Sequence, residues 1–502
     1  MVSGALHPSW RFVAYLSTTF ASLPGPSTLL VALSRNGANP DFTADELFYQ
    51  LETTHATLLI VYPEAFETAL VAAKRASLPS ERVVIFDAAQ ILTHAAGTTT
   101  GALIAEGLMM KPQYTERRLR PGEGKTKIAF LSFSSGTTGK PKAVAIPHFA
   151  LIANVVQLAV HNRVNEDYAP YEDRRFRPGD VCIGVLPFYH IYGLVINLHF
   201  ILFSGLSLVV IPKFNFTGML QSIQRHRITH LMLVPPQVVL LCKHPAVKEY
   251  NLSSIRFIMV GAAPLKTEIT QRIYQMFPDA HIGQAYATTM WSIDQKRGIS
   301  GGAGQLLPGV IARVEKLDGS LAGYDEPGEL VIKTPSVALG YANNAQATRE
   351  TFVDGWVRTG DEVMIDSNKE LWVVDRLKEI MKVRGFQVAP AELEGCILNH
   401  PDVSDCCVVG IPDDYSGEVP LAFVVLTASA AARAKADGAA SAELKTSIMQ
   451  HVADNKVKYK QLAGGVEFVD VIPKNPSGKL LRRVLREMAR DLVKGRDVKA
   501  KL

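Results

Sequence analysis

Short runs of Val, Ile and Leu alternate with longer amphipathic stretches from about residue 54 onward. Continuous apolar runs of this length are typical of strands buried on both faces, as in parallel sheets flanked by helices. The runs that predict such strands are ATLLIVY (56–62), RVVIFD (82–87), VCIGVLPF (181–188), SLVVIP (207–212), HLMLVPP (230–236) and IRFIMVG (255–261). The stretch 42–56 predicts a flanking helix with Thr43 as its N-cap. The first part of the chain is therefore predicted to be α/β.

The pattern changes near Gly328. Compact strands are predicted at 328–333 and 370–376, with turn residues between them. A charged segment then leads into a smaller α+β region. In that region we expect a helix over 391–400, strands over 405–412 and 421–426, and an exposed loop with a helix start in the Ala-rich stretch 427–443. We place the domain boundary so that residues 1–375 form a large N-terminal domain and residues 376–502 a small C-terminal domain.

The longest apolar run, 198–212, is interrupted by Ser204, Gly205 and Ser207. It is too short to cross a bilayer, so it predicts a buried helix, a turn and a buried strand, and we expect no membrane span. The N-terminus has no clear signal peptide, because no basic segment precedes a solid apolar run.

Composition and charge restrict the function only weakly. A chain of 502 residues needs two or more cores. A net charge of +5 over this length does not require nucleic acid as a partner, and no basic stripe with interleaved aromatics is present. The spacing of the five cysteines matches no zinc or disulfide framework. We therefore expect each cysteine to be a small buried apolar residue.

The chain ends in Ala500-Lys501-Leu502. A small residue, a basic residue and a terminal Leu resemble the S-K-L signal that the peroxisomal import receptor binds. This tail predicts that receptor as a partner and the peroxisome as the location. The alternative is a frayed basic tail.

A loop rich in glycine and hydroxyl residues spans 132–144, with the sequence SFSSGTTGKPKAV. Glycine lets a backbone approach phosphate oxygens, hydroxyl and N–H groups donate to those oxygens, and lysine adds positive charge. The loop is not a Walker A motif, because Gly136 and Gly139 enclose only two residues and Pro141 follows Lys140.

The segment SSGTTGKPKAV resembles the phosphate loop of the adenylate-forming enzymes, which include acyl-CoA synthetases, aryl-CoA ligases, luciferases and the adenylation domains of peptide synthetases. Further segments agree in the family's order: LPFYHIYGL (186–194), GAAPL (261–265), GWVRTGDEV (355–363), DRLKEIMKVRGFQVAPAELE (375–394) and PKNPSGKLLRR (473–483). Within the family, FYHIYGL and GFQVAPAELE resemble the 4-coumarate–CoA ligase-like branch. The resemblance implies a large domain of helix-flanked sheets with a β-barrel-like subdomain, followed by a small mobile α+β domain.

The resemblance also implies a two-step reaction. A carboxylate attacks the α-phosphate of ATP to give an acyl-adenylate, and the thiol of coenzyme A then displaces AMP. Chemistry of this kind needs positioning and charge stabilisation rather than a protein nucleophile. The implied partners are a small carboxylic acid, ATP with Mg²⁺, and coenzyme A.

Roles follow from the matching positions, and the resemblance implies each of them. The nucleotide-binding residues would be Ser134, Ser135, Gly136, Thr137, Thr138, Gly139, Lys142, Gly261, Ala262, Ala263, Tyr286, Asp361, Arg376 and Gln387. The catalytic residues would be Lys479, His190 and Thr289, with Lys378 as the hinge. Lys382, Gly385 and Phe386 would serve the thioester step. The acyl pocket would contain Tyr192, Gly193, Ala285, Pro308 and Val310, and the small residues among them, with Gly261, would leave room for a ring or a medium-length chain.

Two departures from the family bear on activity. The opening 35 residues do not resemble the family's longer start, which predicts missing strands and an exposed sheet edge. The second departure follows Tyr286, where relatives have Tyr-Gly-Met-Thr-Glu, whose Thr meets the α-phosphate and whose Glu binds magnesium. Without a gap, Thr289 is kept and Met290 replaces the Glu, although a thioether is a poor ligand for Mg²⁺.

A second alignment places a deletion directly after Tyr286, and no metal ligand is identifiable in either alignment. Three functions stay open: an aryl- or acyl-CoA ligase, a catalytically impaired relative that binds nucleotide or acyl ligand, and another chemistry of the family such as carrier loading or luciferase-like oxidation.

Overall fold

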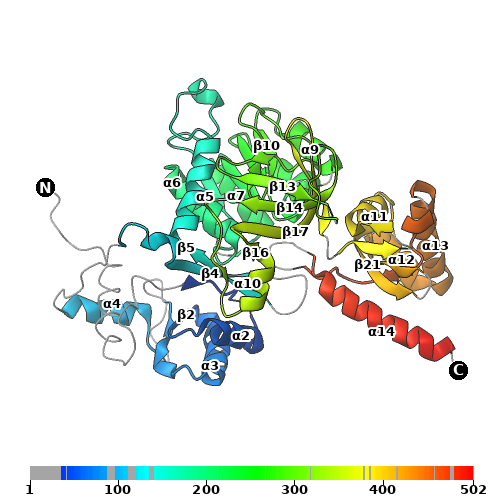
Figure 1. The fold of residues 1–502 in the computed structure, drawn as a ribbon, viewed down its shortest axis with the longest axis horizontal. Coiled ribbons are helices and arrows are strands. Elements are labelled where there is room, and N and C mark those ends of the chain that lie inside the picture. Colours follow the sequence, from blue (N-terminus) through cyan, green and yellow to red (C-terminus); the bar gives the residue numbers. More distant parts are fainter. Residues whose placement is uncertain are drawn as a thin grey trace.

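The computed structural model describes residues 35–40, 42–86, 97–110, 119–134, 141–211, 213–265, 267–316, 318–376, 379–383, 386–413, 416–456, 458–474 and 480–500. A large part, coloured blue to yellow-green in Figure 1, lies beside a smaller part coloured yellow to red. The described residues of these two parts form five separate sheets. Among the described residues, no helix is both long enough and apolar enough to span a membrane.

A seven-stranded sheet forms the centre of the large part, in the order β12-β11-β10-β9-β8-β6-β7. Its strands are β6 (Val181–Gly184), β7 (Ser207–Val210), β8 (His230–Leu233), β9 (Phe257–Val260), β10 (His281–Tyr286), β11 (Thr289–Met290) and β12 (Gln305–Leu306). The strands from β7 to β10 are parallel, and β11 and β12 are antiparallel additions. All residues of β8 and β9 are buried, which confirms the prediction of parallel strands covered on both faces.

Helices flank this sheet. They are α5 (His148–His161), the π-helix η5 (Gly193–Phe200) continued by α6 (Ile201–Phe203), α7 (Phe216–His226), α8 (Pro235–Lys243) and α9 (Thr267–Met276). The predicted helix, turn and strand in 198–212 are present, but the strand β7 is not buried. It lies at the sheet edge, so one side has no neighbour, and Val210 is 50% exposed.

The amino-terminal elements include two smaller sheets. One has the order β1-β4-β5-β15, with β1 (Arg35–Asn36), β4 (Ile128–Ser134), β5 (Lys142–Pro147) and β15 (Gly340–Tyr341). The other pairs β2 (Leu59–Val61) with β3 (Val83–Ile85) in parallel beside α2 (Ala44–Thr54) and α3 (Phe66–Arg75), and α4 (Thr100–Met109) follows. Thr43 is confirmed as the N-cap of α2, because its hydroxyl accepts from Glu46 N at 3.3 Å while Glu46 accepts from Thr43 N at 2.8 Å.

An antiparallel sheet follows the central one. It contains β13 (Ile311–Glu315), β14 (Gly328–Lys333), β16 (Phe352–Val353), β17 (Trp356–Ile365) and β18 (Leu371–Arg376), with α10 (Ala345–Thr351) before β16. Its inward residues form one core with Val314, Leu330, Ile332, Val363 and Leu371. The long strand β17 carries Asp361 and places it opposite Arg376 in the backbone register.

The smaller part has its own sheet and cores. Its strands are β19 (Met381–Val383), β20 (Phe386–Val388), β21 (Val403–Asp413), β22 (Gly417–Leu426) and β23 (Gly465–Phe468), and its helices are α11 (Pro390–Ile397), α12 (Ala428–Ala436), α13 (Gly438–Asn455) and α14 (Arg482–Ala500). Two hydrophobic clusters are built entirely from residues after 380. The boundary between residues 375 and 376 stays a prediction.

The loop expected in the Ala-rich stretch is wrong. Residues 427–443 form α12 and the start of α13 instead. Alanine is the strongest helix former, and Asp437 separates the two helices by accepting a hydrogen bond from Ala439 N at 2.8 Å as the N-cap of α13. The helix start expected in this stretch is confirmed, and only the expected loop is replaced by helix. The cysteine prediction is confirmed, since all five are reduced and buried.

Gly283 in β10 offers a direct test of the central packing. A Cβ added there would lie 2.2 Å from the ring of Trp291, which is itself 1% exposed and stacks on Phe257 at 5.4 Å between ring centroids. We expect Gly283→Ala to lower the free energy of unfolding by about 1–3 kcal/mol, because a packed indole has no room to retreat. Chemical denaturation would measure the loss. Gly395→Ala on α11, where nothing lies within 4 Å, is the matched control and should not destabilise the protein.

Candidate active site

Three of the predicted nucleotide and acyl segments lie at the carboxyl ends of the parallel strands. Leu186 follows β6, Gly261 follows β9 and Tyr286 ends β10. In open α/β sheets, ligands bind at this edge. The topology therefore brings together segments that lie up to a hundred residues apart in the sequence.

Tyr286 and Asp361 form the contact that defines the nucleotide side. The Tyr286 hydroxyl donates a short hydrogen bond to Asp361 Oδ2, across 75 positions of sequence. Asp361 is 7% exposed in the middle of β17, and its backbone N–H donates to Thr359 Oγ1 at 3.1 Å. A carboxylate offers two acceptor oxygens to a diol, and a tyrosine ring beside it offers a flat apolar surface to a base. The residues present fit an adenosine group.

Tyr192 dominates the predicted acyl side. Its hydroxyl donates to Met259 O at 3.1 Å, and burial raises the pKa of this phenol, so it stays neutral. Tyr192 N donates to His190 Nδ1 at 3.3 Å, which places the proton of a neutral His190 ring on Nε2. The short turn from His190 to Tyr192 therefore orients the His190 ring relative to Tyr192.

The expected reason for two small residues is wrong. Gly193 and Gly261 were expected to leave room for an acyl group. A Cβ at Gly193 would instead lie 2.1 Å from Pro187 O, and one at Gly261 would lie 3.1 Å from Tyr192 Cε1. Backbone packing and the tyrosine ring occupy the space, so these glycines first serve the placement of Tyr192.

Pro308 and Val310 lie in the loop after β12. Gln157 of α5 donates to Pro308 O at 2.8 Å, and Val310 packs against the principal core. Ala285 also packs against that core and pairs in register with Met290. The structure thus brings these predicted pocket residues to the same sheet end as Tyr192.

The segment after Tyr286 is a tight hairpin. Tyr286 pairs with Thr289, and the turn between them contains Ala287 with a left-handed φ of 45°. Thr289 is 2% exposed, and its hydroxyl contacts Ala303 O at 2.6 Å and Tyr286 O at 2.9 Å. This placement counts against a phosphate-binding role for Thr289, since the hydroxyl already has buried backbone partners.

Met290 faces the interior in the same hairpin. It is 1% exposed, and Asn162 Nδ2 donates to its sulfur at 3.4 Å. No acidic side chain occupies the position that the ungapped alignment gives to the magnesium-binding Glu. The arrangement favours the alignment with a deletion after Tyr286, because Thr289 and Met290 then need no counterparts in the family motif. Within the described part of the chain, no group of three His, Cys, Asp or Glu side chains could hold a metal ion.

Arg175 anchors the far end of the hairpin, a role that the sequence pattern did not reveal. Its buried guanidinium lies 4.6 Å from the ring of Trp291 and donates to Trp291 O at 3.3 Å, Gln295 O at 3.0 Å and Asn162 Oδ1 at 3.2 Å. Burial lowers the pKa of Arg175 to about 10, so the group is still charged at neutral pH. Its local sequence, EDRRFRP, contains three arginines and gives no signal that singles out the middle one.

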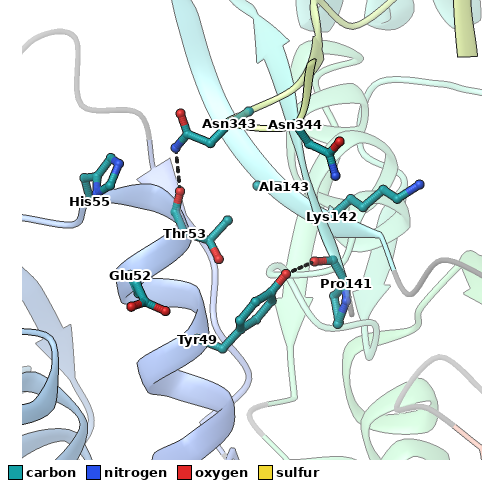
Figure 2. Close-up of a pocket in the computed structure, with 10 residues that line it drawn as sticks. Tyr49, Glu52, Thr53, His55, Pro141, Lys142, Ala143, Asn343 and Asn344 are labelled. Atoms are coloured by element: carbon teal, nitrogen blue, oxygen red, sulfur yellow. Dashed lines mark hydrogen bonds between the residues drawn. The ribbon is translucent and has the colours of Figure 1, made fainter. Parts of the chain in front are cut away.

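The base of the phosphate loop lies between β4 and β5. Ser134 and Lys142 pair in register where the two antiparallel strands meet the loop, so both are at the same end of the sheet. A cavity of about 460 Å³ borders this base, between α2, β5 and the turn after β15 (Figure 2). Tyr49 donates to Pro141 O at 2.8 Å across it, and the Lys142 side chain extends away from Tyr49, with Nζ 5.0 Å from the Tyr341 ring centroid.

Several predicted residues are not described. Those outside the described residues are Ser135, Gly136, Thr137, Thr138, Gly139, Lys378, Gly385, Lys479, Lys501 and Leu502. For Arg376, Lys382, Phe386, Gln387 and Ala500, only the backbone is described. Ala262 and Ala263 follow Gly261 at the end of β9, with Ala262 in the left-handed region at φ 75°. The roles of all these residues stay predictions.

Comparison with known proteins decides the family. The model of the AMP-binding enzyme family matches residues 34–342, and that of the AMP-binding enzyme C-terminal domain matches residues 392–479. The chain belongs to the AMP-binding enzyme family. The family is one of adenylate-forming acid–CoA ligases, and the chain has the family's α/β fold, with a half-barrel sheet and a separate C-terminal domain.

Individual AMP-binding enzymes resemble the chain over most of its length. A probable 4-coumarate–CoA ligase 1 of Dictyostelium discoideum is 34% identical over 92% of this chain and 82% of its own. The 4-coumarate–CoA ligase 3 of Arabidopsis thaliana is 35% identical over 89% and 76%. Among solved structures, the O-succinylbenzoate coenzyme A synthetase of Bacillus subtilis in complex with AMP is 25% identical, with a TM-score of 0.67 over 88% of this chain and 80% of its own. ATP-bound MatB from Rhodopseudomonas palustris, at 24% identity and a TM-score of 0.76 over 96% and 93%, shares the fold.

Proposed function

We infer that this AMP-binding enzyme is an ATP-dependent acid–CoA ligase that converts an aryl or medium-chain carboxylic acid to its acyl-adenylate and then to the CoA thioester. The contact between Tyr286 and Asp361 carries this proposal. It joins a base-stacking ring to a diol acceptor at the edge of the sheet where ligands bind. The resemblance to 4-coumarate–CoA ligases supports an aromatic acid as the first substrate to test.

The predicted site residues fall into two groups, one that would bind ATP and one that would bind the carboxylic acid. Asp361 would accept hydrogen bonds from the ribose hydroxyls, and Tyr286 would cover one face of adenine. Ser134, Lys142 and the loop between them would surround the triphosphate, which supplies the leaving group. On the acyl side, the neutral His190 would present Nε2–H near the carboxylate. The hairpin after Tyr286 offers no carboxylate to a magnesium ion, since the deletion removes the family's acidic ligand and Met290 is buried.

The buried Met290 also supports the second candidate, a relative that binds nucleotide or acyl ligand without efficient catalysis. ATP–pyrophosphate exchange separates the two. We expect the purified full-length chain to exchange pyrophosphate with at least one acid from a panel of cinnamate-like, phenylacetate-like and medium-chain acids, and then to form a thioester with coenzyme A.

The pyrophosphate exchange assay is run on folded protein at a series of Mg²⁺ concentrations. The absence of exchange with every acid, from protein whose folding is established by circular dichroism, would exclude the ligase. Exchange without thioester formation would point to another acceptor in the second step.

A further inference from the structure

A buried ion cluster connects the two segments that must move in the proposed reaction. Arg482, at the start of α14, is 7% exposed; its Nη2 lies 2.8 Å from Glu394 Oε2 and its Nε 3.2 Å from Glu379 Oε2. The two carboxylates are only 10% and 13% exposed at their side chains. Nη2 donates a hydrogen bond to Glu394, and the contact of Nε with Glu379 is an ion pair, so the planar guanidinium faces two carboxylates at once.

One carboxylate belongs to the small unit and the other to the segment that connects it to the large part. Glu394 is in α11, where it also accepts from Val408 N at 2.8 Å, so it is fixed to the small sheet. Glu379 directly follows the predicted hinge residue 378, between β18 of the large part and β19 of the small part. Arg482 therefore links the core of the small unit to the segment that connects it to the large one.

Arg482 also follows the predicted catalytic Lys479 closely in the sequence, beside described residues that pair with one another. Lys474 and Leu480 form an antiparallel bridge, and Leu481 N donates to Pro473 O at 2.9 Å. Residues 473–474 and 480–481 therefore lie side by side, and we call these paired residues the neck. Arg482 lies two residues beyond Leu480, and the amino end of α14 is directed toward the large part in Figure 1. A displacement of Glu379 would therefore be transmitted to this neck.

We propose that Arg482 is a positioning residue that couples the hinge segment, through Glu379, to the neck formed by residues 473–474 and 480–481. The pair with Glu394 holds Arg482 in the small unit, and the pair with Glu379 restrains the hinge. When the hinge pair is intact, the neck that precedes Lys479 is held in one orientation relative to the connecting segment. The part of this inference that concerns reaction steps rests on the proposed function.

Glu379→Gln tests the coupling, because it removes only the hinge charge and leaves the Arg482–Glu394 pair intact. Hydrogen–deuterium exchange, measured by mass spectrometry in the absence of substrates, should become at least about fivefold faster in peptides spanning 374–384 and 473–481, and stay unchanged in α13 and β21. Glu392→Gln is the matched control. Glu392 lies in α11, as Glu394 does, but it pairs with Lys456 at 2.9 Å and with Lys460 at 2.6 Å, both inside the small unit. It should leave both peptides at the wild-type rate.

The half-reactions give the second readout. In Glu379→Gln we expect adenylation, measured by pyrophosphate exchange, to fall about tenfold, while transfer from a supplied acyl-adenylate to coenzyme A stays within about twofold. Arg482→Lys, which keeps one charge but cannot span both carboxylates, should behave in the same way.

Unchanged hydrogen exchange in both peptides of Glu379→Gln would overturn the proposal, and so would an equal loss in both half-reactions. If the wild-type chain exchanges no pyrophosphate with any acid, the proposed function fails, but the hydrogen-exchange comparison still decides whether the pair restrains the hinge and the neck.

Discussion

Lys479→Ala should reduce the rate of acyl-adenylate formation about 10²- to 10³-fold and leave the transfer of a supplied acyl-adenylate to coenzyme A largely intact. The proposed reaction brings a carboxylate to the α-phosphate of ATP, so two anionic groups approach each other. A lysine ammonium between them is a compact charge that stabilises this approach most strongly in the transition state. Removing one such group typically costs this much rate.

Lys474→Ala provides the control for the lysine variant. Lys474 lies at the same neck and forms a half-exposed ion pair with Asp405, an interaction that contributes little to stability. Pyrophosphate exchange should therefore stay near the wild-type rate in Lys474→Ala. Equal rates in the wild type and Lys479→Ala would remove this lysine from the adenylation step, and a parallel loss in both half-reactions would indicate a structural role.

The sequence predicted four strands of the central sheet, β6, β7, β8 and β9, because their signal is local, and it did not predict β10, β11 and β12. The runs that became β8 and β9 are continuous apolar segments, and these are the strands whose residues are all buried. The run that became β7 has the same composition, but its place at the sheet edge depends on the order of strands, which no local pattern encodes. The Ala-rich stretch was misread for the opposite reason, since low complexity was given more weight than the strong helix propensity of alanine.

A site residue could be predicted from the sequence when its role depends on the chemistry of its own side chain. Tyr286 and Asp361 were identified separately, and the fold places them in hydrogen-bond contact. Gly193 and Gly261 were identified correctly as positions that need small residues, but the reason comes from Pro187 and Tyr192, which approach only in the folded chain. Arg175 was missed because its importance lies in the carbonyls it meets, more than a hundred residues later in the sequence.

The alignment of the hairpin after Tyr286 with the family motif could not be decided from the sequence alone. Sequence alone left two alignments, one with Met290 in place of a metal-binding Glu and one with a deletion. Burial distinguishes them, because a residue that replaces an active-site ligand should face the site, whereas Met290 faces Asn162 in the core. Arg175 holds the chain directly beyond Met290, so the hairpin cannot easily rotate to expose this side chain.

The substitution Met290→Glu tests whether position 290 faces the core or the nucleotide. A carboxylate at a position that is 1% exposed would lose its hydration, and the Arg175 guanidinium beside Asn162 already donates to Asn162 Oδ1 and Trp291 O. We expect the free energy of unfolding to fall by about 3 kcal/mol or more, and we expect no gain in Mg²⁺-dependent pyrophosphate exchange. Chemical denaturation followed by tryptophan fluorescence suits the measurement, because Trp291 is adjacent and buried.

Met290→Leu is the control, because a swap of similar volume in a packed core should cost less than about 1.5 kcal/mol. If Met290→Glu kept wild-type stability and increased exchange in proportion to added Mg²⁺, position 290 would face the nucleotide, and the ungapped alignment would be correct. A large loss of stability with unchanged metal dependence instead means that the chain lacks the family's acidic ligand because the segment carrying it is absent. Activity would then depend on metal delivered with the triphosphate.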